Sequence, residues 1–348
     1  MEITKSKYNK ILFRAGVEIK EFLYYSAWDS NGLFKMNTRS NCTRVIATFE
    51  SDRLEGLHEF AFLFNNEIWF IPSDVHEKIA IYNIDEEMIE YVDIPKYKYV
   101  CNNRPFMGYH IINNNAWLFP ASMGAVLEVN LITKTMSYHY LLNENDEKDI
   151  NKKRFIYSSF YVMKDKAYLC PWGGKYITIF NMSNLSVKRM NIEVPQYCYK
   201  NIIVKENEII LVPEKLEDGI IVYNIEKENQ IKKLCLNENN ICDIVIEDKN
   251  KVFILPNGKR MVIILDLFKW NYEILDGLNI DEDVVWYEVR NILNKKYIIP
   301  YTEKGNMVCF EKNEFKILEC QHYMDEEICQ LLLKLKIDEE RKNYERRI

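Results

Sequence analysis

The sequence predicts an all-β protein: a seven-bladed β-propeller of four-stranded antiparallel blades, followed by a C-terminal amphipathic α-helix. Three observations predict it. A short apolar strand that ends in proline recurs along the chain, a second apolar strand that ends in Asn or Asp follows at a nearly constant offset, and small polar residues suited to tight turns separate the strands. Four-stranded repeats of about 40 to 50 residues are typical of propeller blades.

The proline-ended strand is the clearest repeated feature. It occurs six times, as EIWFIP, AWLFP, AYLCP, IILVP, VFILP and KYIIP, which end at Pro72, Pro120, Pro171, Pro213, Pro256 and Pro300. Successive prolines lie 48, 51, 42, 43 and 44 residues apart. Proline lacks an N–H group, so we expect each strand to leave its sheet at this point and continue into a loop.

A second strand follows each proline and ends in a residue whose side-chain carbonyl can cap a turn. These residues lie ten or eleven positions after the prolines and are Asn83, Asn130, Asn181, Asn224, Asp266 and Glu311. The same offset separates Ala27 from Asn37, and Ala27 lies 45 residues before Pro72. We therefore expect a seventh copy, without the proline, near the start of the chain.

The repeat register defines the predicted domains. Residues 8–321 are predicted to form the propeller and residues 322–348 a helical tail. A single sheet cannot cover both of its own faces, so each copy must pack against its neighbours, and a closed ring removes the exposed ends of such an array.

The pattern resembles that of bacterial Kelch-like propellers. The Tyr–Asn endings at Asn83 and Asn224 match the third strand of a Kelch repeat, Gly173 and Gly174 follow Pro171 where Kelch repeats carry a Gly pair, and Trp270 lies near the position of the Kelch tryptophan. The other copies have proline in place of the Gly pair, and most lack the tryptophan. The resemblance covers about residues 8–321 and implies the propeller fold.

The tail carries apolar residues at helical spacing. Ile328, Leu331, Leu332 and Leu335 would share one face of a helix, with acidic residues early and basic residues late, as the helix dipole favours. This stripe can pack on the propeller as a structural cap, which is the simpler interpretation. The alternative is a docking or dimerisation helix.

Composition excludes several classes of function. The formal net charge of -6 arises from interspersed Lys, Glu and Asp, so no basic stripe indicates nucleic-acid binding. The nine cysteines include no CxxC pair, so we expect neither a disulfide framework nor a zinc site, and we expect no cofactor. Without a signal peptide or an apolar run long enough to span a membrane, the chain is expected to be cytoplasmic.

Candidate binding residues come from two kinds of segment that should share one end of the blades. These are the loops that follow the prolines and the segments that begin each blade. Aromatic rings there would suit a peptide, protein or glycan ligand, with charges fixing its orientation, or the rings could simply pack between blades. The candidates are His58, Phe106, Tyr157, Trp172, Lys175, Tyr199, Lys200, Arg260, Trp286, Tyr287 and Tyr301.

Catalytic signals are weak. The five histidines are dispersed, and no HExxH, GxSxG or phosphate-binding glycine motif is present. Glu59, Asp243 and Glu288 are the candidate acid or base groups at the channel mouth. The favoured function is a noncatalytic interaction scaffold. The alternatives are a carbohydrate- or peptide-modifying lyase or hydrolase, and an accessory subunit that recruits substrates to a modification system.

Overall fold

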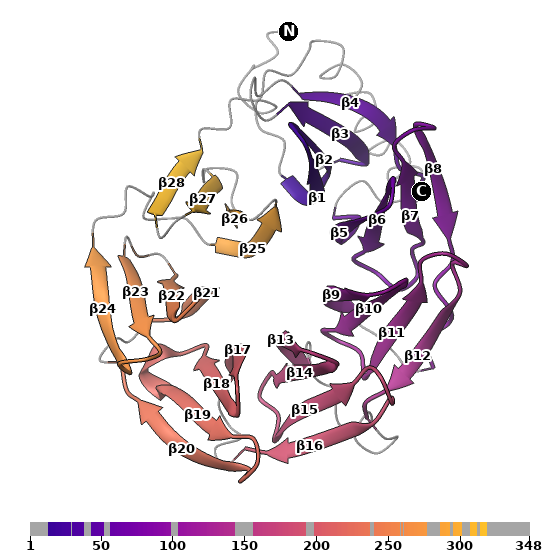
Figure 1. Ribbon diagram of the computed structural model, residues 1–348. Coiled ribbons are helices and arrows are strands. Elements are labelled where there is room, and N and C mark those ends of the chain that lie inside the picture. Colours follow the sequence, from indigo (N-terminus) through magenta and orange to yellow (C-terminus); the bar gives the residue numbers. More distant parts are fainter. Residues whose placement is uncertain are drawn as a thin grey trace, which may run out of the picture. The chain divides into compact units, whose positions relative to one another are not determined.

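A computed structural model describes the architecture of the chain (Figure 1). The described residues are 13–28, 30–37, 43–51, 56–98, 104–142, 156–192, 198–236, 240–257, 259, 261–276, 286–292, 295–300, 307–311 and 314–318. They form seven four-stranded antiparallel sheets, numbered here sheets 1 to 7 in chain order, and the strands of each sheet are consecutive in the sequence. The predicted C-terminal helix at 322–348 lies outside the described residues.

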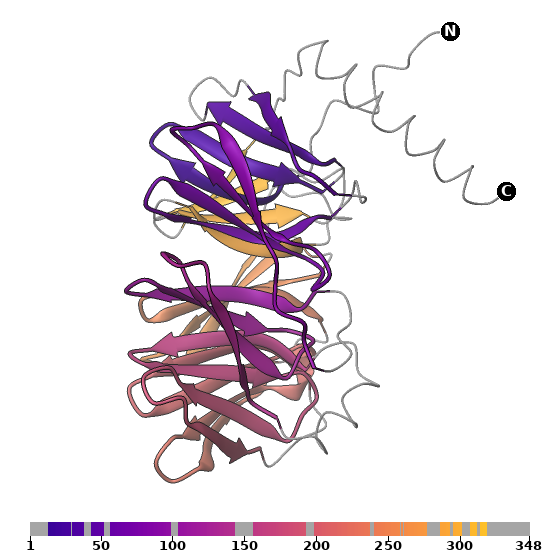
Figure 2. The same cartoon turned by 90° about the vertical axis from the view of Figure 1, so that its right-hand side faces the viewer.

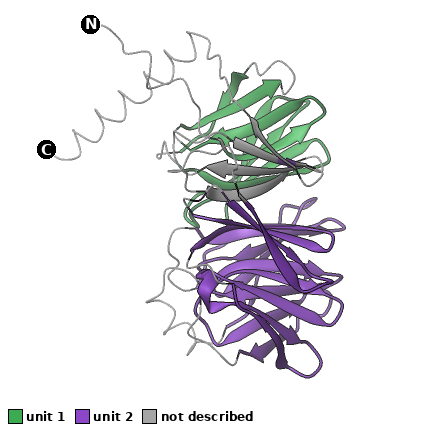
Figure 3. Cartoon of the chain, turned by 90° about the vertical axis from the view of Figure 1, so that its left-hand side faces the viewer, with its two compact units in different colours: residues 1–94, 319–348 green, residues 95–318 purple. Residues whose placement is uncertain are grey.

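The chain divides into two compact units, which are coloured separately in Figure 3. Unit 1 comprises residues 1–94 and 319–348, and unit 2 comprises residues 95–318. Unit 1 contains sheets 1 and 2. Their strands are β1 (Phe13–Ile19), β2 (Phe22–Ala27), β3 (Gly32–Asn37) and β4 (Thr43–Thr48), then β5 (His58–Phe64), β6 (Glu67–Pro72), β7 (Ile79–Asn83) and β8 (Met88–Val92).

Unit 2 contains sheets 3 to 7 and one short 3₁₀ helix, η1 (Leu216–Asp218). Sheets 3, 4 and 5 comprise β9 (Phe106–Ile112), β10 (Asn115–Pro120), β11 (Ala125–Asn130) and β12 (Met136–Tyr140); β13 (Tyr157–Met163), β14 (Lys166–Pro171), β15 (Tyr176–Asn181) and β16 (Val187–Asn191); and β17 (Tyr199–Lys205), β18 (Glu208–Pro213), β19 (Ile220–Asn224) and β20 (Asn229–Leu234). Sheets 6 and 7 comprise β21 (Cys242–Asp248), β22 (Lys251–Pro256), β23 (Met261–Asp266) and β24 (Asn271–Asp276); and β25 (Trp286–Ile292), β26 (Lys295–Pro300), β27 (Met307–Glu311) and β28 (Glu314–Leu318).

The predicted strand boundaries are confirmed. Each of the six prolines is the last residue of the second strand of a sheet, and Ala27 ends β2 in the copy that lacks proline. The predicted turn caps also form at five of the six positions, and the side chain of the sixth, Glu311, lies outside the described part of the structure. The Asn224 side-chain carbonyl, for example, accepts hydrogen bonds from the N–H groups of Glu226 (3.1 Å) and Lys227 (2.8 Å). The same arrangement occurs at Asn83, Asn130, Asn181 and Asp266.

Burial follows strand position within each sheet. Second strands such as β6, β10 and β18 are buried along their last five residues, and these residues form continuous apolar runs. Fourth strands such as β20 are mostly exposed and polar. Figure 2 shows the same sheets in a second view.

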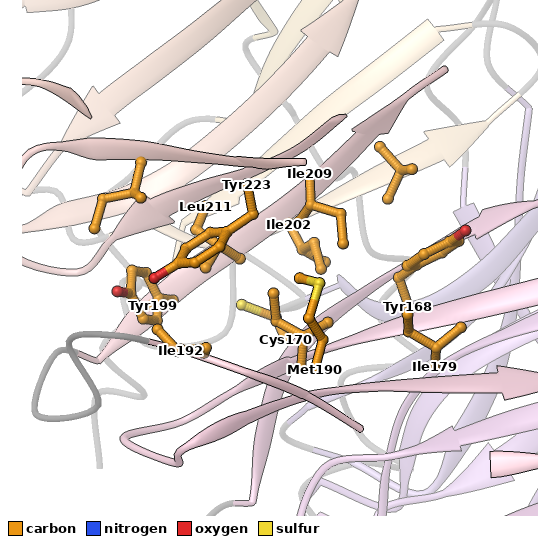
Figure 4. Close-up of a cluster of buried hydrophobic side chains, with 13 residues drawn as sticks. Tyr168, Cys170, Ile179, Met190, Ile192, Tyr199, Ile202, Ile209, Leu211 and Tyr223 are labelled. Carbon is orange, nitrogen blue, oxygen red and sulfur yellow. The ribbon is translucent and has the colours of Figure 1, made fainter. Parts of the chain in front are cut away.

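Apolar cores lie between consecutive sheets of the same unit. In unit 2, the core shown in Figure 4 joins Tyr168, Cys170 and Met190 of sheet 4 to residues of sheet 5 such as Tyr199 and Tyr223. Equivalent cores join sheets 3 and 4, sheets 5 and 6, and, in unit 1, sheets 1 and 2. Each sheet therefore gains its stability from its neighbours, as expected for a repeat architecture.

No helix in the described ranges is long and apolar enough to cross a membrane.

Candidate functional site

The end of each sheet where the second strand reaches its proline, here called the proline end, also holds the start of the first strand. His58 pairs with Pro72, Tyr157 with Pro171, and the other sheets repeat this register. The residue after the proline also bonds back to the residue before the first strand. Trp172, for example, donates its N–H to the carbonyl of Ile156 at 2.9 Å. Within each sheet, the two kinds of predicted site segment therefore share one end.

Backbone hydrogen bonds also connect the proline ends of consecutive sheets within a unit. In unit 2, the carbonyl of Glu214 accepts from the N–H of Cys242 at 2.6 Å, and Trp172 forms an antiparallel bridge with Cys198. In unit 1, the carbonyl of Trp28 accepts from the N–H of Gly56 at 2.7 Å. The loops after the second strands are thus fixed to the sheet that follows them.

Every first strand carries a β-bulge immediately after its first residue. In β5, His58 pairs with Pro72 and Phe60 with Ile71, so Glu59 is the extra residue. The other six first strands have a register shift at the same place. The seven bulge residues are Arg14, Glu59, Met107, Ser158, Lys200, Asp243 and Tyr287. Bulges redirect side chains and are frequent beside functional sites, so these positions form the candidate site.

In unit 1, the bulge residues of sheets 1 and 2 bind each other. The Arg14 guanidinium forms an ion pair with the Glu59 carboxylate, and both side chains are 5% exposed or less. Arg14 also donates through Nε to the carbonyl of His58 at 3.0 Å and lies 4.5 Å from the centre of the Trp28 ring. Glu59, a predicted acid or base, is therefore held as the partner of a buried cation.

His58 is part of the same buried region. Its ring centre lies 4.4 Å from that of Phe49 and 5.3 Å from that of Phe70. Burial, with a smaller effect from the nearby Arg14 charge, lowers the pKa of His58 to about 3. The ring is therefore neutral at physiological pH, and its Nδ1 atom has no hydrogen-bond partner among the described residues.

In unit 2, the bulge residues differ from one another in chemistry and burial. Ser158 donates a long hydrogen bond of 3.5 Å to the carbonyl of Cys170. Lys200 is half-buried, and its ammonium makes no hydrogen bond or ion pair with any residue in the described ranges. Asp243 is 6% exposed. Lys200 and Asp243 repeat the order of Arg14 and Glu59, a cation in one sheet and a carboxylate in the next, but within the described residues Lys200 forms no ion pair like that of Arg14.

The predicted aromatic residues are mostly core residues. Phe106, Tyr157 and Tyr199 are at most 3% exposed, and Tyr199 lies within the core between sheets 4 and 5 (Figure 4). The Tyr157 hydroxyl lies 3.2 Å from Thr178 Oγ1 inside the protein. Their burial agrees with the packing alternative, because rings that fill a core offer no surface to a ligand.

The two remaining described candidates, Trp172 and Lys175, lie in one loop of sheet 4. Trp172 is half-buried and Lys175 is exposed. Trp286, Tyr287 and Glu288 begin β25, where the backbone alone is described. Arg260 and Tyr301 lie outside the described residues.

Two residues of unit 1 were missed by the sequence analysis, Arg14 and Trp28. Arg14 lies 45 residues before Glu59 (59 − 14), the offset that also separates Ala27 from Pro72 (72 − 27). The repeat register was therefore the signal that could have found it. The described residues contain no group of three or more His, Cys, Asp or Glu side chains that could hold a metal ion.

Comparison with known proteins shows the fold of the chain. No family model and no curated protein matches the sequence. Among solved structures, a catalytically inactive virginiamycin B lyase from Staphylococcus aureus with quinupristin matches at a TM-score of 0.59 and 10% identity, over 85% of this chain and 93% of that one.

Two other similar structures have different roles. BamB from Moraxella catarrhalis matches at a TM-score of 0.59 and 11% identity, over 83% of this chain and 82% of that one. PorZ, a surface component of the type-IX secretion system of Porphyromonas gingivalis, matches at 0.55 and 10%, over 91% of this chain and 39% of that one. These neighbours are β-propeller-like proteins, and they include both an enzyme and other classes of protein. The chain therefore has an all-β, propeller-like fold of four-stranded antiparallel sheets.

Proposed function

We propose that the chain is a noncatalytic binding module that recognises a protein, peptide or glycan through the proline ends of its sheets. The observation that carries the proposal is the bulge that recurs in all seven first strands, where the backbone is constant and the side chain differs from sheet to sheet. A constant backbone that carries different side chains at equivalent positions is what a recognition surface requires.

Unit 2 is the better supported location within this proposal. In unit 1, Arg14 and Glu59 neutralise each other and are buried. In unit 2, Lys200 is half-buried without an ionic partner in the described ranges, and Lys175 and Lys215 are exposed in the adjoining loops. A charged group without an internal partner can pair with a ligand at little cost in lost internal contacts.

The finer architecture belongs to the same proposal. We infer that the seven sheets are the blades of a single ring of the Kelch-like kind, because the copies share one register and each sheet is complete within its own segment of chain. In this arrangement the seven proline ends would surround one mouth of the channel. The C-terminal segment 322–348, as a cap or docking helix, and a cytoplasmic location complete the proposal.

The enzyme alternative has less support. Its candidate acids are Glu59, Asp243 and Glu288. Glu59 is 1% exposed and bound to Arg14, so its carboxylate is not available to exchange protons with a substrate. A lyase among the similar structures shows that an enzyme can have this fold, and at 10% identity it indicates nothing about the chemistry of this chain. An accessory subunit that recruits a substrate would use the same binding surface.

Site-specific photo-crosslinking tests the proposal. A photo-reactive residue would replace Lys215, which is exposed at the proline end of sheet 5, and in a control it would replace Lys227, which is exposed in the turn at the opposite end of that sheet. We expect a specific adduct from position 215 alone. The adducted partner, once purified, should bind the Lys200→Gln variant about tenfold more weakly than the wild type. Equal adducts from both positions, or unchanged affinity of Lys200→Gln, would argue against the proposal.

A further inference from the structure

Lys200 is a half-buried lysine whose ammonium forms no ion pair within the described ranges. It occupies the bulge of β17, and its ammonium contacts no acceptor in the described part of the chain. Lys205, at the other end of the same strand, has internal partners for its ammonium. Its ammonium lies 3.7 Å from the Glu247 carboxylate and 3.4 Å from Asn250 Oδ1. An ammonium without an acceptor in the described ranges gains from an anionic partner, so Lys200 can take one from a ligand.

The loop from Trp172 to Lys175 lies beside Lys200. Trp172 of this loop forms a backbone bridge with Cys198, which lies two residues before Lys200 in the sequence. The far end of the loop is also held, because the carbonyl of Lys175 accepts from the N–H of Ile192 at 2.8 Å. The loop therefore presents the half-buried Trp172 ring on a fixed backbone, together with Lys175, which is exposed and forms no ion pair with the residues that the structure describes.

Glycines shape this loop. Gly173 has a φ of 65°, in the left-handed region that favours glycine, and a Cβ atom there would lie 3.5 Å from Cys198 Sγ. The N–H of the next residue, Gly174, makes no hydrogen bond with the described residues. It can therefore donate to the backbone carbonyl of an extended peptide.

The carboxylates of Glu214 and Asp243 limit the charge that a ligand can carry. Glu214 and Asp243 both lie close enough to Cys242 to raise the pKa of its thiol, while Lys200 lowers it. Carboxylates as well as the Lys200 ammonium therefore act on Cys242, and Lys200 is not part of a basic stripe. Such a mixed field disfavours a polyanion, and it suits a ligand that brings one carboxylate to one ammonium.

We infer that Lys200 and the Trp172–Lys175 loop form a subsite for an acidic side chain of a peptide. The inference rests on the proposed binding function and names its ligand class. The peptide carboxylate would pair with Lys200, a neighbouring apolar side chain would cover the Trp172 ring, and the N–H of Gly174 would bond a peptide carbonyl.

Two matched peptide pools test this subsite. Both pools are capped at their ends and randomised at two positions on each side of a central residue, which is Glu in one pool and Gln in the other. Retention of each pool on the immobilised full-length protein is measured by mass spectrometry. We expect the Glu pool to be retained about tenfold more strongly, because a hydrogen bond to a charged group is worth about that factor.

Variants of the protein show which side chain causes the preference for the Glu pool. Lys200→Gln should remove it, Lys200→Arg should keep it, and Lys227→Gln, at the opposite end of sheet 5, should leave it unchanged. Circular dichroism of each variant shows whether the sheets remain folded. Since Lys200→Arg keeps the charge, it separates loss of the carboxylate contact from general damage to the strand.

The outcomes separate this inference from the proposed function. Equal retention of both pools would overturn the carboxylate subsite and leave peptide binding intact. Retention of neither pool, with tight binding of an oligogalacturonate probe, would overturn the peptide assignment and leave a binding module for acidic glycans. A Glu preference that survives Lys200→Gln would place the carboxylate elsewhere and overturn the site.

Discussion

Arg14 and Glu59 occupy the same bulge position in adjacent sheets and form a buried ion pair with each other. The pair lies against the Trp28 ring and the carbonyl of His58, so the guanidinium has polar or aromatic partners in several directions. This arrangement ties sheet 1 to sheet 2 at their proline ends. It also distinguishes unit 1 from unit 2, where Lys200, the cation at the bulge position of β17, is unpaired in the described ranges.

Arg14→Met is expected to lower the free energy of unfolding by about 3 to 5 kcal/mol, because it leaves the Glu59 carboxylate buried without its counter-charge. The double variant Arg14→Met with Glu59→Gln should recover part of that loss. Urea unfolding followed by circular dichroism measures both. A single variant as stable as the wild type would show that the pair is open to water.

His58 is expected to make the protein less stable in acid. Its folded pKa of about 3 lies below the unfolded value of 6.5, so the unfolded chain binds the proton more readily between these pH values. The stabilising contribution is therefore complete above pH 6.5 and is lost as the pH falls towards 3, by about 1.4 kcal/mol per pH unit. Urea titrations at several pH values should show this slope reduced in His58→Phe. An identical slope in both proteins would contradict the assignment.

Gly108→Val is expected to destabilise unit 2 by about 1 to 3 kcal/mol. A Cβ atom at Gly108 would lie 2.5 Å from Cε1 of Phe160, whose ring packs at 4.4 Å on Phe119. The ring would have to move out of the contact between sheets 3 and 4. Combining the change with Phe160→Ala should make it less costly, and thermal unfolding of the single and double variants tests this. Additive effects would show that the two positions do not interact.

Cysteine reactivity should follow burial. Burial raises the pKa of both Cys170 and Cys242 to about 12, so at pH 8 these thiols are protonated as well as covered. Cys235 is exposed. Brief treatment of the native protein with iodoacetamide should therefore alkylate Cys235 and spare the other two, as read by peptide mass spectrometry. In urea all three cysteines should be labelled equally, which serves as the reference. Equal labelling of the three cysteines in the native protein would show that the sheets open readily.

The repeat pattern carried most of the information about local structure. Pro72 and its counterparts end their strands because an imino acid cannot extend the ladder, and Asn83 and its counterparts cap turns with their own side chains. These are properties of residues and their immediate neighbours, so they can be predicted from the sequence alone. The same holds for the four-strand period that predicted the class of fold.

The candidate site could be predicted only in part. The register placed Glu59, Lys200 and Asp243 at equivalent positions, but not their environments. Glu59 is buried with a partner 45 residues away (59 − 14), whereas Lys200 has none in the described ranges. The aromatic candidates Tyr157 and Tyr199 fill cores between sheets.

The order, length and polarity of the strands, and the end of each sheet at which the loops lie, follow from the amino-acid sequence because they depend on local backbone chemistry. The tertiary structure alone decided which side chains are covered and which charges meet. The reason is that burial and ion pairing depend on the distance between side chains of neighbouring sheets. A bulge also changes where a side chain points without changing the spacing of residues along the chain.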